Sequence, residues 1–227
     1  GYSSGGLTGY ALVNQEAGMP KQLRHVQGYV VADMAYKSSD YDWLSLWAAD
    51  LSYQRDLYDQ GVFGSFVPFQ LLGSLAKSDP DGDSPLLPGL TNLQAALFFG
   101  TAPLFGATPI HYLAGVFDVD GLPTGLQYVP TGNFLDFLES AIVWQPTKFF
   151  LDYDEVLAGV DNPFDDNLAA VTIPVYNWGA AGGVGPYGTE MFGLLGSRDV
   201  AENLVSLHPP EEILLEFGHI DLFLAEN

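Results

Sequence analysis

The chain has 227 residues, of which 48% are apolar and 14% aromatic, enough to build one large domain or a core with an insertion. Seven Lys and Arg residues stand against 28 Asp and Glu residues, for a formal net charge of −21. This charge argues against binding to nucleic acid or to an anionic membrane surface, because both require clustered cations. No apolar run has the length of a membrane span, and without cysteine there is no disulfide framework. The acidity is compatible with secretion or with a saline habitat, and neither follows from charge alone.

The first five residues, Gly1-Tyr2-Ser3-Ser4-Gly5, have the G-x-S-x-G spacing of a nucleophile elbow. In such an elbow a serine lies on a sharp turn between a strand and a helix. Glycines two residues before and after the serine avoid side-chain clashes in that turn. Taken alone, the five residues also fit an ordinary loop, since Gly and Ser often cluster in loops.

The residues after this stretch predict a helix and then a strand. We expect a helix over Leu7–Glu16, ended by Gly18-Met19-Pro20. The apolar, β-branched run His25–Ala32 predicts a buried strand, which Asp33 closes. This order is typical of an α/β fold, in which another strand would precede the elbow.

The middle of the chain, from about residue 38 to residue 166, is rich in Phe, Leu, Tyr and Trp and is interrupted by Gly and Pro. We expect a mostly helical insertion, with helices over Tyr41–Tyr58, Leu90–Phe99, Pro109–Phe117, Asn133–Val143 and Tyr153–Ala158. Within it, Asp79, Asp81 and Asp83 have the alternating spacing of a calcium loop. Leu90 stands where such a loop needs a bidentate acid, so we interpret the three aspartates as a solvated acidic turn.

The C-terminal part returns to strands. We expect strands over Val171–Trp178 and Ile213–Phe217, and helices over Thr189–Leu195 and Asp199–Ser206. The Gly-rich run 179–188 lacks the spacing and the lysine of a phosphate-binding loop. We interpret it as a loop close to the active site.

Taken in chain order, these features resemble the C-terminal half of an α/β-hydrolase. They are the serine elbow, a helix, a strand, a long insertion, a strand starting Ile173-Pro174-Val175, and the ending Phe217-Gly218-His219-x-Asp221. The resemblance covers residues 1–40 and 170–225. It implies an α/β fold with hydrolase core over residues 1–40 and 169–227 and a large, mostly helical cap over residues 41–168.

The resemblance also implies roles for particular residues. Ser3 would be the nucleophile, His219 the general base, and the backbone N–H of Ser4 one donor of the oxyanion hole. Asp221, two residues after the histidine, is expected to stabilise its loop or the helix that follows. The remaining histidines are expected to be structural or exposed: His25, His111 and His208.

The acid of the triad has three candidates. Family members usually carry it shortly after the strand that corresponds to Val171–Trp178, but the run 179–188 contains no carboxylate. Asp199 is the first choice, and its alternative role is the N-cap of the expected helix. Glu190 is the second choice. Asp33 is the third, because some relatives carry the acid at the end of that earlier strand.

The implied function is hydrolysis of an ester with apolar substituents through an acyl-enzyme, as in lipases and carboxylesterases, with no cofactor and no metal. An acyltransferase on the same fold is one alternative, since the same acyl-enzyme serves both reactions when water is excluded. The other is an inactive binding protein that has kept the hydrolase fold.

The implied partners are a small ester and the remaining strands of the sheet. A complete α/β-hydrolase has several strands before its elbow, including the nucleophile strand and the loop that supplies the second oxyanion donor. A sheet of three strands would leave an edge and an apolar face bare. We therefore expect an N-terminal half, either a separate polypeptide cut just before the elbow or residues that precede this sequence.

Overall fold

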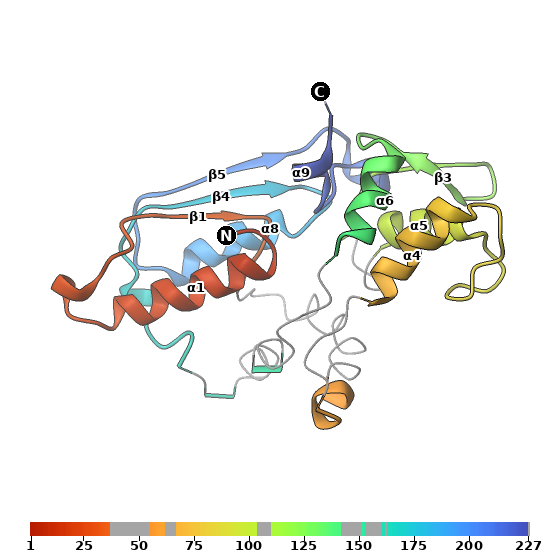
Figure 1. Cartoon of the computed structure of the whole chain (residues 1–227). Helices are drawn as coiled ribbons and strands as arrows, with labels where there is room; N and C mark the ends of the chain where they lie inside the picture. Colours follow the sequence, from red (N-terminus) through yellow and green to blue (C-terminus); the bar gives the residue numbers. More distant parts are fainter. Residues whose placement is uncertain are drawn as a thin grey trace.

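The computed structural model describes residues 1–36, 55–61, 67–103, 110–141, 151–152, 160–161 and 163–226. These residues form a mixture of helices and strands (Figure 1). The α-helices are α1 (Ser4–Ala17), α4 (Val67–Ser78), α5 (Asn92–Thr101), α6 (Thr131–Glu139), α8 (Gly185–Glu190) and α9 (Asp221–Leu224). The 3₁₀ helices are η1 (Lys21–Leu23), η2 (Leu168–Ala170), η3 (Met191–Leu194) and η4 (Pro210–Leu215). The strands are β1 (Tyr29–Ala32), β2 (Gly115–Phe117), β3 (Pro123–Leu126), β4 (Val175–Ala180) and β5 (Val200–Val205).

A parallel sheet of three strands, in the order β1-β4-β5, joins the N-terminal and C-terminal parts of the chain. Tyr2 adds a parallel bridge to Ala32, the last residue of β1. Since Ala32 also pairs with Trp178 of β4, the stretch before α1 lies on the edge of β1 opposite to β4. This arrangement is compatible with part of an α/β fold.

The two faces of this sheet differ in how they are covered. Helices α1 and α8 lie along one face (Figure 1). Side chains alternate between the faces of a strand, so Val31 and Val175 are buried beneath these helices. Val30 and Trp178 point to the opposite face, where they are 57% and 46% exposed.

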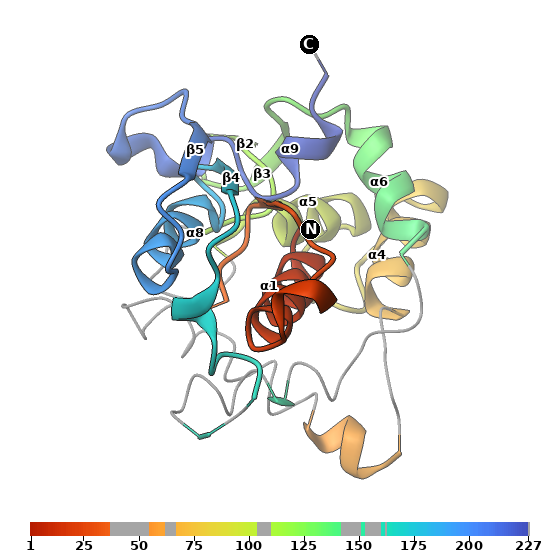
Figure 2. The ribbon, with the colours of Figure 1, turned by 90° about the vertical axis from the view of Figure 1, so that its left-hand side faces the viewer.

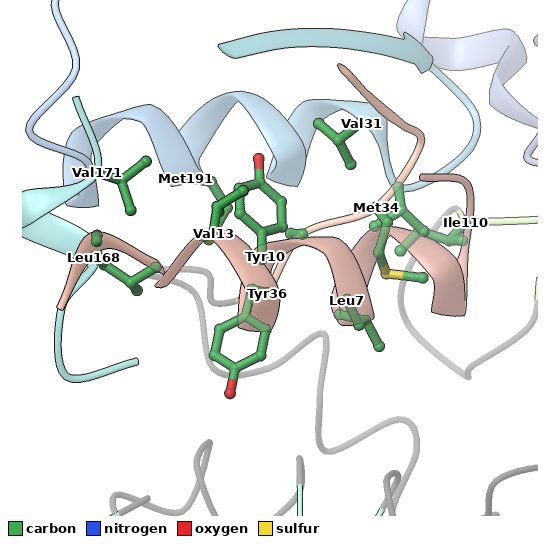
Figure 3. Packing of buried hydrophobic residues seen from close by; sticks show 13 residues of the cluster. Leu7, Tyr10, Val13, Val31, Met34, Tyr36, Ile110, Leu168, Val171 and Met191 are labelled. Carbon is green, nitrogen blue, oxygen red and sulfur yellow. The ribbon is translucent and has the colours of Figure 1, made fainter. Parts of the chain in front are cut away.

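The first hydrophobic core lies between α1 and the sheet (Figure 3). Leu7, Tyr10 and Val13 recur every three residues along α1, which places them on one buried face of the helix. They pack with Val31 and other residues of the same cluster, which include Met34, Tyr36, Ile110, Leu168, Val171 and Met191.

A second core lies among α4, α5, α6 and the hairpin of β2 and β3. Figure 2 shows these three helices grouped together, and in Figure 1 they lie beyond the carboxyl ends of the parallel strands. Phe134 and Leu138 of α6 are fully buried, together with Ala96 of α5. A Cβ on Gly73 of α4 would lie 2.8 Å from the backbone nitrogen of Glu139, so this glycine allows α4 and α6 to pack closely.

Several expected elements are present. Helix α1 covers the expected 7–16, α5 covers most of 90–99, and α6 begins before the expected 133–143. Strand β1 is shorter than the expected 25–32, and β4 starts after the expected residue 171. Residues 41–54 and 153–158 lie outside the described residues.

Three expected elements are wrong. Within Pro109–Phe117, residues Gly115–Phe117 form β2, because the turn at Asp118–Gly121 folds the chain into a hairpin with β3. Within Asp199–Ser206, residues Val200–Val205 form β5, since β4 offers a parallel neighbour for the backbone. Ile213–Phe217 is not a strand. It follows two prolines and joins η4.

Candidate active site

Ser3 lies at the junction between the bridge to β1 and the start of α1, with φ 51° and ψ −132°. A residue other than glycine rarely has positive φ, and such strain is often found at functional sites. The nitrogen of Ser3 donates to the carbonyl of Ala32 at 3.3 Å, which fixes the turn to the end of β1. The stretch with the elbow pattern is thus a sharp turn between the bridge at Tyr2 and α1, with half-buried Ser3 at its corner.

The two glycines of the elbow pattern do not have the same importance. A Cβ built on Gly1 would collide with the carbonyl of Gly5, as the spacing predicts. A Cβ on Gly5 would meet no atom within 4 Å. Gly6, one residue further on, is the second crowded position, because its Cβ would lie 2.9 Å from that of Met34.

The amides at the start of α1 point toward the turn. Gly5 donates to the carbonyl of Tyr2, and Gly6 and Leu7 donate to the carbonyl of Ser3. The N–H of Ser4 has no backbone acceptor in the part of the chain that the structure describes. It is therefore free to donate to a negatively charged oxygen next to Ser3.

His219 forms a buried pair with Asp33. The Nδ1 atom of His219 lies 2.6 Å from Oδ2 of Asp33, and the two side chains are 6% and 0% exposed. Asp33 directly follows β1 and has φ 51°, a conformation that Asp tolerates better than most residues. Its carboxylate also accepts the backbone N–H groups of Ala180 at 2.7 Å and Val184 at 2.9 Å.

The Gly-rich run 179–188 lies against this pair. A Cβ on Gly183 would overlap the carboxylate of Asp33, and one on Gly182 would overlap the ring of His111. Glycines therefore allow the backbone at the end of β4 and after it to approach the Asp33 carboxylate and donate to it. The expectation that the run lies close to the candidate site agrees with these contacts, but the expectation of a loop is wrong in part, because Gly179 and Ala180 end β4 and residues 185–188 belong to α8.

The structure does not bring Asp199 or Glu190 to His219. The carbonyl of Asp199 accepts the N–H of Val175 at 2.9 Å, which places this exposed aspartate at the amino end of the sheet. Glu190 is exposed at the last residue of α8. Of the three acids considered from the sequence, only Asp33 reaches the histidine, so the order of preference is corrected in its favour.

Backbone hydrogen bonds fix the turn that carries His219. The N–H of His219 donates to the carbonyl of His111 at 3.0 Å, and that of Ile220 donates to Tyr112 at 2.7 Å. The carbonyl of His219 accepts the hydroxyl of Tyr2 at 3.0 Å. The residue before Ser3 thus contacts His219, while the Ser3 hydroxyl itself donates no hydrogen bond to His219 within the described residues.

Two buried carboxylates hold the same turn. Oδ2 of Asp221 accepts the N–H groups of Gly218 and Ala114, both at 2.8 Å, which agrees with its expected role in stabilising the loop. Burial raises the pKa of Asp221, and the two N–H groups offset only part of that rise, so the pKa is about 7. Glu216 accepts the N–H groups of Leu207, His208 and Phe217. Burial by itself would raise the pKa of Glu216, but the hydrogen bonds from these backbone N–H groups outweigh burial. The pKa of Glu216 therefore lies below its ordinary value.

The other histidines are either held by structural partners or exposed. His111 is fully buried, and its Nε2 lies 2.8 Å from the carbonyl of Glu216. His208 contacts Glu212 at 3.0 Å and Tyr128 at 2.9 Å. His25 is exposed at the surface.

The described ranges contain no group of three His, Cys, Asp or Glu side chains that could hold a metal ion. No helix within them is both long and apolar enough to cross a membrane. The larger of the two hollows described, about 230 Å³, lies beside Asp199 and Tyr176, at the end of the sheet away from His219.

Comparison with known proteins gives no relative for this chain: no family model matches it, and neither does any curated protein or solved structure.

Proposed function

We propose that this protein is a serine hydrolase that cleaves a carboxylic ester, with Ser3 as nucleophile, His219 as general base and Asp33 as the acid. The buried pair of His219 and Asp33, at the carboxyl end of β1 where the elbow also lies, is the observation that carries the proposal. The sequence favoured Asp199 as the acid, and the proposal assigns this role to Asp33 instead.

The proposed chemistry follows from which imidazole nitrogen Asp33 engages. A carboxylate on Nδ1 favours the tautomer in which Nδ1 carries the proton and Nε2 is free to accept one. His219 would then take the proton of the Ser3 hydroxyl as its Oγ attacks the ester carbon. The N–H groups of Ala180 and Val184 hold the carboxylate in its orientation during this step.

The N–H of Ser4 would stabilise the oxyanion of the tetrahedral intermediate. His219 would return its proton to the departing alcohol, which leaves the acyl group on Ser3. In the second half of the reaction His219 would take a proton from the attacking water and pass it to the Ser3 oxygen as the bond to the acyl group breaks and the acid is released. Catalytic hydrogen bonds are often formed only with substrate bound, so the missing bond between Ser3 and His219 is expected to form in the complex.

We also propose that the sheet is the C-terminal part of an α/β-hydrolase sheet. The order elbow, β1, β4, β5 and their parallel direction support this proposal. The group of α4, α5 and α6 beyond the carboxyl ends of the strands supports a cap above the site.

The test is denaturing mass spectrometry after treatment with a fluorophosphonate, which reacts with activated serines. We expect one adduct, on Ser3, which is lost in Ser3→Ala and in His219→Ala. Ser4→Ala is the matched control, since it keeps the backbone N–H and is expected to be labelled. An unlabelled wild-type protein, or an adduct on another serine, would overturn the proposal. Labelled protein that transfers acyl groups to alcohols faster than to water would instead be an acyltransferase.

A further inference from the structure

Tyr2 connects the nucleophile elbow to the turn of the general base. Its hydroxyl donates to the carbonyl of His219 at 3.0 Å across 217 residues of sequence. Its ring stacks on the imidazole, with ring centroids 4.8 Å apart and an angle of 22° between the planes. One side chain thus contacts both the backbone and the ring of His219.

The contacts with Tyr2 restrain motions of His219 that the hydrogen bond to Asp33 leaves free. The bond to Asp33 fixes one ring nitrogen, but the ring can still tilt about that contact as the backbone turn shifts. The N–H of His219 is held by His111, while its carbonyl is held by Tyr2. The stacked ring of Tyr2 lies on one face of the imidazole and opposes a tilt of the imidazole toward that face.

Tyr2 is itself fixed from several directions. Its backbone bridges to Ala32, and its carbonyl accepts the N–H of Gly5 at 2.9 Å. Its ring contacts Phe223 of α9, with centroids 4.0 Å apart. Burial, with a further contribution from the charge of Asp33, raises the pKa of Tyr2, so its hydroxyl keeps the proton that it donates.

We propose that Tyr2 is a positioning residue for the base. It fixes His219 relative to the serine that directly follows it in the chain, and it thereby couples the geometry of the elbow to that of the turn carrying His219. This inference rests on the proposed function, and it adds a residue to which the triad alone gives no role.

Tyr2→Phe tests the hydroxyl without removing the ring. A hydrogen bond contributes about 1 kcal/mol, so we expect kcat and the rate of Ser3 labelling to fall about 3- to 10-fold. KM should be unchanged, because Tyr2 acts through His219. Tyr2→Leu also removes the stacking and should lower both rates further, by about 10- to 70-fold in total.

Tyr29→Phe is the matched control. The hydroxyl of Tyr29 donates to the carbonyl of Gly6 at 2.7 Å in the neighbouring core, away from His219. The Tyr29→Phe variant should lower the stability of the protein as Tyr2→Phe does, but it should leave kcat unchanged. A proton NMR spectrum gives a second readout: the Nδ1 proton of His219 should exchange with solvent faster in Tyr2→Phe than in wild type or Tyr29→Phe.

The outcomes separate the two proposals. The role of Tyr2 alone would be overturned if the wild-type protein is labelled at Ser3 while Tyr2→Phe keeps the wild-type rates and exchange. The same holds if Tyr2→Phe loses no more than Tyr29→Phe does. Wild-type protein that is not labelled at Ser3 would overturn the proposed function and, with it, this inference.

Discussion

The Nδ1 atom of His219 lies 2.6 Å from the carboxylate of Asp33, although 186 residues separate the two in the chain. Asp33 directly follows β1, and His219 lies in the turn between η4 and α9. The carboxylate therefore lies at the end of the strand with which Tyr2 pairs, and the C-terminal turn brings the histidine to it.

Replacement of Asp33 by Asn should nearly abolish turnover while preserving the fold. The amide keeps the shape of the side chain, but its NH₂ group favours the imidazole tautomer in which Nε2 carries the proton. We expect kcat to fall by about 10³- to 10⁴-fold, as wrong-tautomer variants do. Steady-state kinetics with a chromogenic ester measures this fall.

Asp199→Asn is the control for that variant, since Asp199 is an exposed aspartate at the opposite end of the strands. Its kcat should stay within about twofold of wild type, as expected for a surface substitution with no contact to the site. A dead Asp199→Asn with an active Asp33→Asn would return the acid to the position that the sequence favoured.

Gly183→Ala should displace Asp33. A Cβ at this position would overlap the carboxylate, and the neighbouring Val184 N–H that holds it would also have to move. We expect the rate of Ser3 labelling to fall at least about tenfold, because a shift of the acid reorients the base. Gly193→Ala, whose Cβ would meet no atom within 4 Å, should keep the wild-type rate. Equal rates for the two variants would contradict the role of this loop.

Leu7→Ala should destabilise the first core without touching the chemistry. Leu7 is 2% exposed on α1, while Leu12 on the same helix is 49% exposed. Loss of a buried leucine costs about 2–5 kcal/mol of the free energy of unfolding, whereas Leu12→Ala should cost less than about 1 kcal/mol. Urea denaturation measures both. Similar losses would mean that α1 does not pack through the face that carries Leu7.

Local patterns predicted the parts of the structure that depend on neighbours in the sequence. The spacing of Leu7, Tyr10 and Val13 predicts α1, because three residues fill almost one turn. The elbow pattern predicts a turn whose crowded backbone needs glycine, and the collision at Gly1 agrees with it.

Contacts between distant segments decided the rest. Residues Val200–Val205 form a strand because their backbone pairs with β4. No local pattern in the sequence reveals that contact. The choice of Asp33 over Asp199 depends on the end of β4 and the turn after it, where Ala180 and Val184 donate their N–H groups to one carboxylate. The one sequence signal for Asp33 was its position directly after a buried strand, and nothing marked Tyr2 as a contact of His219.

Asp221 should make stability depend on pH. Its pKa is raised from 3.8 to about 7 by burial, so the folded protein retains a proton that the unfolded chain loses as pH rises above about 4. The folded state binds more protons in this window, and its stability must fall as pH rises toward 7. Asp221→Asn cannot ionise, so its free energy of unfolding relative to wild type should rise by about 2–3 kcal/mol between pH 5 and pH 8.5. Urea denaturation at the two pH values measures this change, and Asp199→Asn, which replaces an exposed aspartate, should show none of it. A constant difference between Asp221→Asn and wild type would mean that the Asp221 carboxylate is already charged at pH 5.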